Sequence, residues 1–466
     1  MKNLEEEQQS TLDDQSEMSV PSEIAGEISR LLVKSIKMEN LADGEGEEEE
    51  EEEEEEKLAS DDQIAQETTI SLAPKEIISE ILSRLPVKTL LRSRSVSKSW
   101  LSLISHPSFN NLQFTQATAA RRTALLISAY DTSTRRRYFL STARDGGPVT
   151  HLVTPYARTI TNKETTELEH LNGLVLFTSG NGFIEHNFAF VINPSTRKIF
   201  KLPGPASEPA HLTYGKGHIC YFFGFDESRN EHKILTIRVF DILSLKLNHT
   251  IEIMIFSMLS LSWRKIDVDL PDDAIRDWNI GTKHSVCVNS VIHLILQNQN
   301  EILAFDLRTE KFSIINLPID AIPDATDKNY CYKGLNTIIS NCPFLMKING
   351  FLGVIRHNPV AGLNEMDIWI LEDYENRRWV RETVGFLKSW FVLDGPFPLN
   401  SFIRKDNRYP NTRLSMDMID VRMYDVERES VKSVEFTLGY QFLHPSTVRF
   451  DHVRSYTESI LPLPRN

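Results

Sequence analysis

The stretch EILAFDLRTEKFSIINLP, residues 301–318, carries the pattern that decides the fold. A run of β-forming residues, EILAF, is followed by the polar stretch DLRTE and then by a second apolar run that ends in Leu317-Pro318. Two short apolar runs separated by polar turn residues are typical of an antiparallel hairpin. We therefore expect a β-hairpin here.

The same unit recurs along the chain, at intervals of roughly 45 to 65 residues. Further short apolar runs separated by turn residues fill residues 120–466, where long helical periodicities are absent. Many short strands at close intervals predict a large all-β domain, and a repeat of this length fits one blade of a β-propeller per unit. A two-sheet sandwich is the alternative that the same pattern allows. The other copies of the unit are residues 190–203, 255–271, 367–382 and 420–436.

Residues 71–115 predict a small all-α domain. Apolar residues recur at helical spacing on both sides of Pro86, and Pro74 suits the first turn of a helix, where its missing N–H has no partner to lose. We expect three short helices within residues 71–112. Because so small a helical segment buries little area by itself, we also expect its apolar face, centred on Leu85, Pro86 and Trp100, to be exposed and covered by a partner.

Residues 1–70 predict a disordered acidic tail. They contain 24 Asp and Glu residues against 5 Lys and Arg residues, and residues 47–56 are ten consecutive glutamates. Adjacent like charges repel one another and bury nothing, so this segment stays solvated. The net charge of −14 therefore comes from the tail, and the rest of the chain is mildly basic. Its basic runs are short, which argues against a nucleic-acid site.

Several features of the whole chain predict an intracellular, non-catalytic protein. The first residues are acidic, unlike those of a signal peptide, and no apolar stretch approaches the roughly 18 residues of a membrane span. The four cysteines lack zinc-type spacing, so we expect no metal site. GxSxG, Walker, HExxH and dinucleotide-binding motifs are missing, so we expect neither a catalytic residue nor a cofactor. We expect the protein in the cytoplasm, the nucleus or both.

Residues 72–112 resemble the F-box. That family combines a leucine-proline start, pairs of apolar residues, a leucine-proline-valine step, two leucines and a lysine-x-tryptophan. Two positions depart from the pattern: Ala73 stands where leucine usually precedes the proline, and Ser97 stands where cysteine is frequent. Neither change removes the apolar face. The matching residues are Pro74, Ile77, Ile78, Ile81, Leu82, Leu85, Pro86, Val87, Leu90, Leu91, Val96, Lys98 and Trp100.

Most of the remaining chain resembles the F-box-associated domain of plant F-box proteins, which implies a domain at residues 120–466. Residues 288–294 depart from that family, because it prefers asparagine-glycine at the turn where this chain has Asn289-Ser290. The segments that carry the resemblance are residues 170–175, 193–197, 202–203, 223–226, 232–234, 262–264, 305–306, 310–312, 317–318, 349–352, 368–370 and 456–460.

The two resemblances together imply a function. The F-box would bind a Skp1-like protein and, through it, cullin and RING subunits, while the β domain would hold a target protein. The chain would then be the substrate-recognition adaptor of an SCF-type E3 ubiquitin ligase without being an enzyme itself. An excess of basic residues in the F-box suits an acidic partner. The residues expected to bind Skp1 are Leu72, Pro74, Ile77, Ile81, Leu85, Pro86, Leu90, Leu91, Val96 and Trp100.

Two other functions fit some of these features. A Skp1-bound interaction protein that acts without a cullin would have the same sequence pattern, because the cullin contact lies largely on Skp1. A propeller-type enzyme or sugar-binding module would need carboxylates or histidines that converge in a funnel. The target itself cannot be read from the sequence, and we expect long polar loops to recognise it. These loops are residues 144–166, 204–217, 271–284, 318–335 and 392–413.

Overall fold

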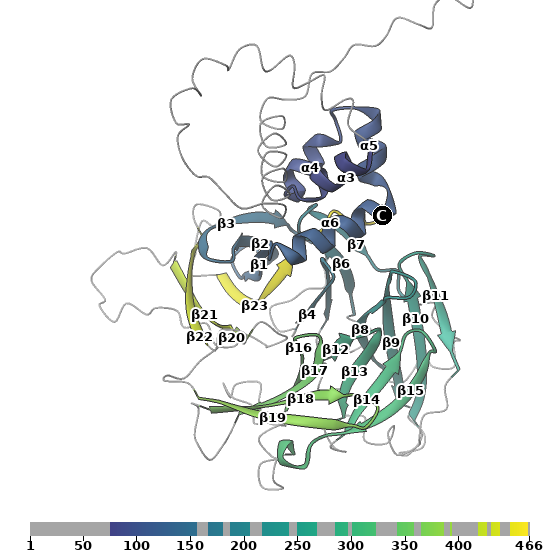
Figure 1. The fold of residues 1–466 in the computed structure, drawn as a ribbon. Coiled ribbons are helices and arrows are strands. Elements are labelled where there is room, and N and C mark those ends of the chain that lie inside the picture. The colour runs from purple at the N-terminus through teal and green to yellow at the C-terminus, as the bar shows by residue number, and fades with distance from the viewer. Residues whose placement is uncertain are drawn as a thin grey trace, which may run out of the picture. The chain divides into compact units, whose positions relative to one another are not determined.

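The computed structural model divides the chain into two units, drawn together in Figure 1. The helical unit contains the residues up to Arg122 and also Glu458–Leu461, and the β unit contains Thr123–Thr457 and Pro462–Asn466. The acidic tail, Leu72 and Pro74 lie outside the described residues. The structure describes residues 75–155, 166–179, 187–205, 217–241, 249–267, 285–296, 301–322, 343–357, 365–385, 392–393, 418–425, 430–438 and 448–464.

The helical unit contains four helices in its described residues, one more than expected. The additional helix begins at Pro107, which suits a first helical position, and it buries Phe109 and Ala117. Its apolar periodicity is weak, which is why the sequence pattern indicated only three helices. None of the described helices is long and apolar enough to cross a membrane. The helices are α3 (Lys75–Ser83), α4 (Val87–Ser93), α5 (Lys98–Ser105) and α6 (Pro107–Ala119).

Two helix starts in this unit follow from local sequence. Pro86 directly precedes α4, and its fixed φ of −58° and extended ψ lead the chain into that helix. Ser97 caps α5, because its Oγ accepts a hydrogen bond from the backbone N–H of Trp100 at 3.1 Å. These two residues therefore fix where the second and third helices begin.

The β unit is a five-bladed propeller, so both the predicted all-β class and the predicted propeller are confirmed. Figure 1 shows its sheets arranged around a common centre. Blade 1 comprises β23 (Val448–Thr457), β1 (Thr123–Asp131), β2 (Arg136–Ala143) and β3 (Gly146–Val153). Blade 2 comprises β4 (Thr166–Leu171), β5 (Leu174–Ser179), β6 (Ala189–Asn193) and β7 (Lys198–Lys201). Blade 3 comprises β8 (Gly217–Asp226), β9 (Glu231–Asp241), β10 (His249–Ser257) and β11 (Ser262–Ile266). Blade 4 comprises β12 (Ser285–Val288), β13 (Val291–Leu296), β14 (Glu301–Asp306) and β15 (Lys311–Asn316). Blade 5 comprises β16 (Phe344–Ile348), β17 (Phe351–His357), β18 (Glu365–Asp373) and β19 (Arg378–Gly385).

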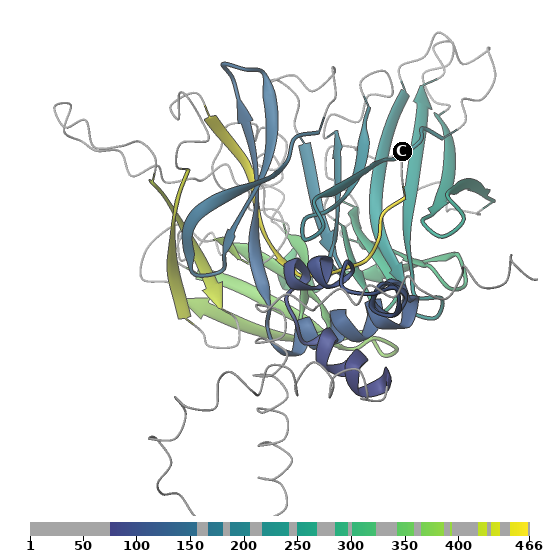
Figure 2. The ribbon, with the colours of Figure 1, turned by 90° about the horizontal axis from the view of Figure 1, so that it is seen from above.

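The innermost strand of each blade faces the centre of the ring. Strand β8 contacts β4 and β12, β12 contacts β16, and β23 contacts β4. In Figure 1 the labels of β4, β8, β12 and β16 lie nearest the centre, and Figure 2 shows the same blades after a turn of 90°. Residues on these inner strands therefore form the wall of the propeller's centre.

The ends of the β unit close the ring. Strand β23 pairs antiparallel with β1, from Thr123↔Thr457 to Asp131↔Val448, so the last strand of the chain completes the first blade. Three more strands, β20 (Val392–Leu393), β21 (Met418–Asp425) and β22 (Ser430–Thr437), extend the same sheet, because β22 pairs with β3. The repeat at residues 420–436 lies in this β21–β22 hairpin. Assigning it a blade of its own was wrong, because a hairpin pattern does not name the strand that the hairpin joins.

The cores lie between neighbouring blades. Phe139 of blade 1 meets Phe177 of blade 2 edge-on, with ring centroids 5.0 Å apart. Phe305 of blade 4 belongs to a cluster that it shares with blade 3, and Trp369 of blade 5 packs in a cluster with Ile302 of blade 4. Burial thus holds blade 1 against blade 2, blade 3 against blade 4, and blade 4 against blade 5.

Candidate partner-binding site

Of the eight described residues that were predicted to bind Skp1, five are buried in the helical unit's own core. Leu85 and Leu90 are completely buried, and Trp100 exposes 8% of its surface. The expectation of an open apolar face centred on them is wrong, because residues from all four helices pack with one another in a single cluster. Of the other predicted residues, Ile81 and Val96 belong to the same cluster, and Pro86 and Leu91 are partly buried.

Two large apolar side chains on the described surface of this unit are exposed. Ile77 of α3 exposes 47% of its surface and Leu101 of α5 exposes 46%, and the two helices contact each other. Ile77 was among the predicted residues, whereas Leu101 was missed. The sequence could have predicted the exposure of Leu101, because successive residues of a helix point about 100° apart. When Trp100 points into the core, Leu101 therefore points away from it. These two residues form the exposed apolar pair of the helical unit.

Exposed basic side chains lie on α3, on α5 and on the intervening helix α4. Lys75, Lys88 and Lys98 are exposed, as is Arg92. Of the two acids of α3, Glu80 is paired with Arg84 across one helical turn, at 2.6 Å. The described surface of α3, α4 and α5 therefore carries a net positive charge.

A segment that sequence reasoning placed in the β domain completes this helical core. Ile460, from the chain's other end, is completely buried in the cluster that contains Leu85 and Trp100. The only signal for this segment was a resemblance, since Ser459-Ile460 matches the terminal motif of the F-box-associated domain. The residues of that motif do not by themselves predict that it packs against helices.

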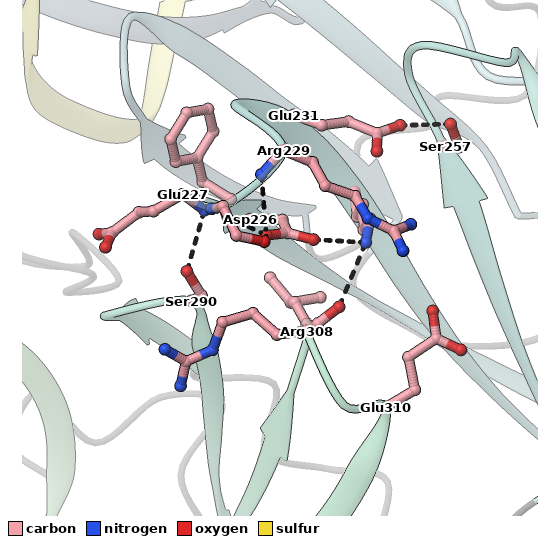
Figure 3. Close-up of polar contacts among 12 residues, drawn as sticks. Asp226, Glu227, Arg229, Glu231, Ser257, Ser290, Arg308 and Glu310 are labelled. Atoms are coloured by element: carbon pink, nitrogen blue, oxygen red, sulfur yellow. Dashed lines mark hydrogen bonds and ion pairs between the residues drawn. The ribbon is translucent and has the colours of Figure 1, made fainter.

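The propeller contains a polar network between blades 3 and 4, drawn in Figure 3. The buried Lys233 ammonium donates to the Asp226 carboxylate at 2.7 Å and to the Leu307 carbonyl oxygen at 3.2 Å. The Glu227 N–H donates to Ser290 Oγ at 2.9 Å. Burial alone would raise the pKa of Asp226, but hydrogen bonds from Lys233 and Ser228 outweigh it and hold that pKa below its ordinary value. The network fixes one blade to the next.

The departure at Asn289-Ser290 is part of that network. Both residues have positive φ, 51° and 64°, which glycine adopts more easily than serine. Ser290 is almost completely buried, and its carbonyl oxygen accepts the Leu307 N–H at 2.9 Å. The hydrogen bonds of Ser290 therefore offset the backbone strain, and the turn forms without the family's glycine.

A cavity of about 310 Å³ lies among the inner strands. In its wall, Glu169 of β4 accepts a hydrogen bond from Ser285 Oγ at 2.7 Å and another from the Phe223 N–H at 3.0 Å, so one carboxyl joins three blades. Burial raises the pKa of Glu169 to about 8 and lowers that of the neighbouring His170 to about 4, so both groups are uncharged at neutral pH.

The side chains that line the cavity bear on the alternative of a propeller enzyme, which would need converging carboxylates or histidines. Glu169 is the one carboxyl and His170 the one imidazole among the described residues that line it. The described residues also contain no cluster of three or more His, Cys, Asp or Glu placed to hold a metal ion. The loops expected to recognise a target lie mostly outside the described residues, so this part of the prediction stays a prediction.

Comparison with known proteins agrees with both units. Residues 74–112 match the F-box domain, and residues 124–455 match the F-box associated beta propeller domain. The F-box protein DOR of Arabidopsis thaliana is 24% identical, over 82% of this chain and 92% of its own length. F-box protein At1g30790 of the same plant is 27% identical, over 66% of this chain and 74% of its own length.

A more distant likeness is found among solved structures. TolB from Acinetobacter baumannii matches with a TM-score of 0.33 and 8% identity, over 75% of this chain and 72% of TolB, which is too weak to carry an argument. The family match, in contrast, spans most of the chain, and its limits agree with the helical unit and the propeller described above. The chain therefore belongs to the F-box proteins that carry an F-box associated β-propeller domain.

Proposed function

We propose that this chain is the substrate-recognition subunit of an SCF-type E3 ubiquitin ligase. The helical unit binds a Skp1-like protein, which in turn binds cullin and RING subunits, and the propeller holds the target protein. The observation that carries the proposal is the exposed apolar pair, Ile77 and Leu101, on a unit whose other described large apolar residues are buried or partly buried. Covering apolar surface stabilises a complex by about 25 cal/mol per Å².

The predicted Skp1-binding residues take two roles in this proposal. Ile77, together with Leu101 and the partly buried Pro86 and Leu91, contacts Skp1 directly. The buried Leu85, Leu90 and Trp100 support that surface from below, as do Ile81 and Val96. Leu72 and Pro74 stay predicted contacts. The exposed bases of α3, α4 and α5 favour an acidic partner and speed its encounter with this unit.

Proximity supplies the mechanism, so this chain needs no catalytic residue. A target held by the propeller is kept close to a ubiquitin-charged E2 that other subunits recruit, and a high effective concentration makes transfer to a target lysine fast. Such a subunit acts in the cytoplasm or the nucleus. The buried thiol of Cys287, which forms no disulfide, is in keeping with a reducing compartment.

The proposal is tested by co-purification of the full chain with a Skp1-like protein and a cullin. Ile77→Asp combined with Leu101→Asp places two carboxylates where apolar side chains meet the partner, so we expect at least about a hundredfold weaker Skp1 binding. Because both side chains are nearly half exposed, the unfolding temperature of the chain should change little.

The matched control is Leu259→Asp on the propeller, where the leucine is 81% exposed. This variant should bind Skp1 as the wild type does. Capture of Skp1 without any cullin would favour the interaction protein that acts without a ligase. No binding of any Skp1-like protein by the wild-type chain would refute the proposal.

A further inference from the structure

Four residues near the C-terminus, Glu458–Leu461, belong to the helical unit. Glu458–Leu461 group with the helices and not with the propeller strand that directly precedes them. Ile460 is completely buried and Ser459 exposes 2% of its surface. A terminal segment with no structural role would not be buried in this way. We call Glu458–Leu461 the clasp.

The clasp supplies a hydrogen bond that helix α4 lacks locally. Pro86 stands at the position before α4, and it has no side chain that could accept a hydrogen bond from the helix. The carboxylate of Glu458 accepts the N–H of Val87 at 3.3 Å instead, although the two residues are 371 positions apart. A carboxylate at a helix N-terminus is also favoured by the helix dipole. The first turn of α4 is therefore fixed by the far end of the chain.

Arg122 joins the clasp to α3. Its guanidinium donates to the carbonyl oxygens of Arg84 at 2.7 Å and Ser83 at 3.2 Å, at the end of α3. Its own carbonyl oxygen accepts the N–H of Glu458 at 3.2 Å. Burial lowers the pKa of the Arg122 guanidinium, and the charge of Glu458 acts in the opposite direction and offsets part of that effect. One arginine thus connects the end of α3 to the start of the clasp.

The clasp also fills the core beneath the exposed apolar pair. The Ile460 side chain packs in the cluster of Leu85, Trp100 and Ile104, while its N–H donates to Gln113 Oε1 of α6 at 3.1 Å. Removing a completely buried isoleucine leaves a void that the surrounding side chains fill only in part. Helices α3 and α5, which carry the exposed pair, would lose a contact that fixes their spacing.

We propose that the clasp is a structural part of the Skp1-docking unit, so that Skp1 binding requires an intact C-terminal segment as well as the F-box. This inference rests on the proposed function. The F-box helices leave the ribosome first, but their unit is complete only after residue 461 has been made. A chain that stops early carries the whole F-box pattern and still lacks part of its core. Skp1 would therefore select chains that extend through residue 461.

Two truncated chains test the proposal. A chain that ends at Thr457 keeps every propeller strand and loses the clasp, whereas a chain that ends at Leu461 keeps both. We expect amides of α3–α6 in the shorter chain to exchange with solvent at least about tenfold faster. We expect its affinity for Skp1 to fall by at least about tenfold, with the longer chain unchanged.

Point variants separate the clasp from general damage. Ile460→Asp should reproduce the shorter chain, and Ile319→Asp, at a propeller residue that is 86% exposed, should not. Amide exchange in β8 and β9 should stay at the wild-type rate in all four variants. Faster exchange there in Ile460→Asp would mean that the propeller is damaged too, and would overturn the assignment of the clasp to the helical unit.

Amide exchange and Skp1 binding, measured together, also distinguish failure of the clasp proposal from failure of the adaptor function on which it rests. If the wild-type chain binds no Skp1, the adaptor function fails, while the exchange rates of α3–α6 still decide whether the clasp completes the unit. If the wild type binds Skp1 and the chain ending at Thr457 binds it equally well, the dependence on the clasp is refuted.

Discussion

The helical unit and the propeller both join their elements through side-chain hydrogen bonds, but they differ in how many segments supply those bonds. Both must join elements that no hydrogen-bonded ladder connects. The helical unit uses side chains on one remote segment, with Glu458 accepting from the N–H of Val87. The propeller repeats the solution between blades, with Lys233 donating to the Leu307 carbonyl oxygen. Since the helical unit depends on one remote segment and the propeller on many contacts, we expect damage to stay within two blades in the propeller and to spread through all helices in the other unit.

The largest effect is expected where a buried charge loses its partner. Lys233→Met keeps the aliphatic stem and removes the ammonium, which leaves the fully buried Asp226 carboxylate without its cation. Breaking a buried ion pair on one side costs about 3–5 kcal/mol of unfolding free energy. Denaturant unfolding measures this loss, and amide exchange should place it in blades 3 and 4.

The control for this variant is an exposed ion pair between Arg264 on the outer strand of blade 3 and Glu310 of blade 4. Arg264 donates to Glu310 at 2.8 Å, and its side chain is 55% exposed, so Arg264→Met should cost less than about 1 kcal/mol. Adding Asp226→Asn to Lys233→Met should recover part of the loss, because the neutral amide needs no cation. Equal costs for the two single variants would show that the buried pair carries no special weight.

The next effect tests the helical unit with two leucines of opposite exposure. Leu85→Ala opens a void in the core and should destabilise the unit by about 2–5 kcal/mol. Leu101→Ala removes a half-exposed side chain, so it should change stability by less than about 0.5 kcal/mol and still weaken Skp1 binding. Amide exchange of α3–α6 measures the first effect, and titration with Skp1 measures the second.

The assignment of Leu85 to the core and Leu101 to the docking surface is contradicted if the two variants have the same amide exchange and the same Skp1 binding. If Leu85→Ala weakens Skp1 binding without faster exchange, then Leu85 is a contact residue and the burial in the free unit does not describe the complex. If Leu101→Ala leaves binding unchanged, the exposed apolar pair is not the docking surface.

The sequence predicted the helical elements better than the faces they bury. The apolar stripe of Ile77, Ile81 and Leu85 correctly indicated a helix, but a stripe has the same spacing whether it faces a partner or a neighbouring helix. Because the apolar periodicity of α6 is weak, its contribution to the core was missed. Buried residues of the stripe, such as Leu85, were therefore predicted to contact Skp1. Only the packed structure separates Ile77 at the surface from Leu85 in the core.

In the propeller, local hairpins were predictable and distant pairings were not. The repeats at residues 190–203, 255–271, 301–318 and 367–382 are the two outer strands of blades 2 to 5. A hairpin is decided by neighbouring residues, so its pattern is visible in sequence. The pairing of β23 with β1 and of β22 with β3 joins residues far apart, and nothing in either segment names its partner.

A smaller effect, which depends on pH, is expected at the centre of the propeller. The pKa of Glu169 is raised to about 8 in the folded chain, so the folded state holds a proton that the unfolded state has already released above about pH 4.5. Stability from this group is therefore present at low pH and is lost as the pH rises toward 8, by at most about 1.4 kcal/mol per pH unit. Glu169→Gln keeps an uncharged side chain of the same shape and should remove this slope.

The measurement belongs between about pH 6.5 and 8. Burial lowers the pKa of His170, His232 and His293 to about 4, so these groups make stability rise with pH below that window and would mask the carboxyl. In the window, unfolding curves should show the wild type losing stability with rising pH and Glu169→Gln staying level. Parallel curves for the two proteins would mean that Glu169 is ionised in the folded chain.

The smallest effect concerns the left-handed turn between β12 and β13 of blade 4, whose Ser290 hydroxyl accepts a hydrogen bond from blade 3. Ser290→Ala removes the acceptor for the Glu227 N–H and keeps a side chain at a φ of 64°, so we expect a loss of about 1 kcal/mol. Ser290→Gly removes the same acceptor but relieves strain of about 1 kcal/mol, which should leave stability near that of the wild type. Thermal unfolding compares the two variants. If glycine proves as damaging as alanine, the hydrogen bond and not the backbone decides this position, and the serine does not compensate for a missing glycine.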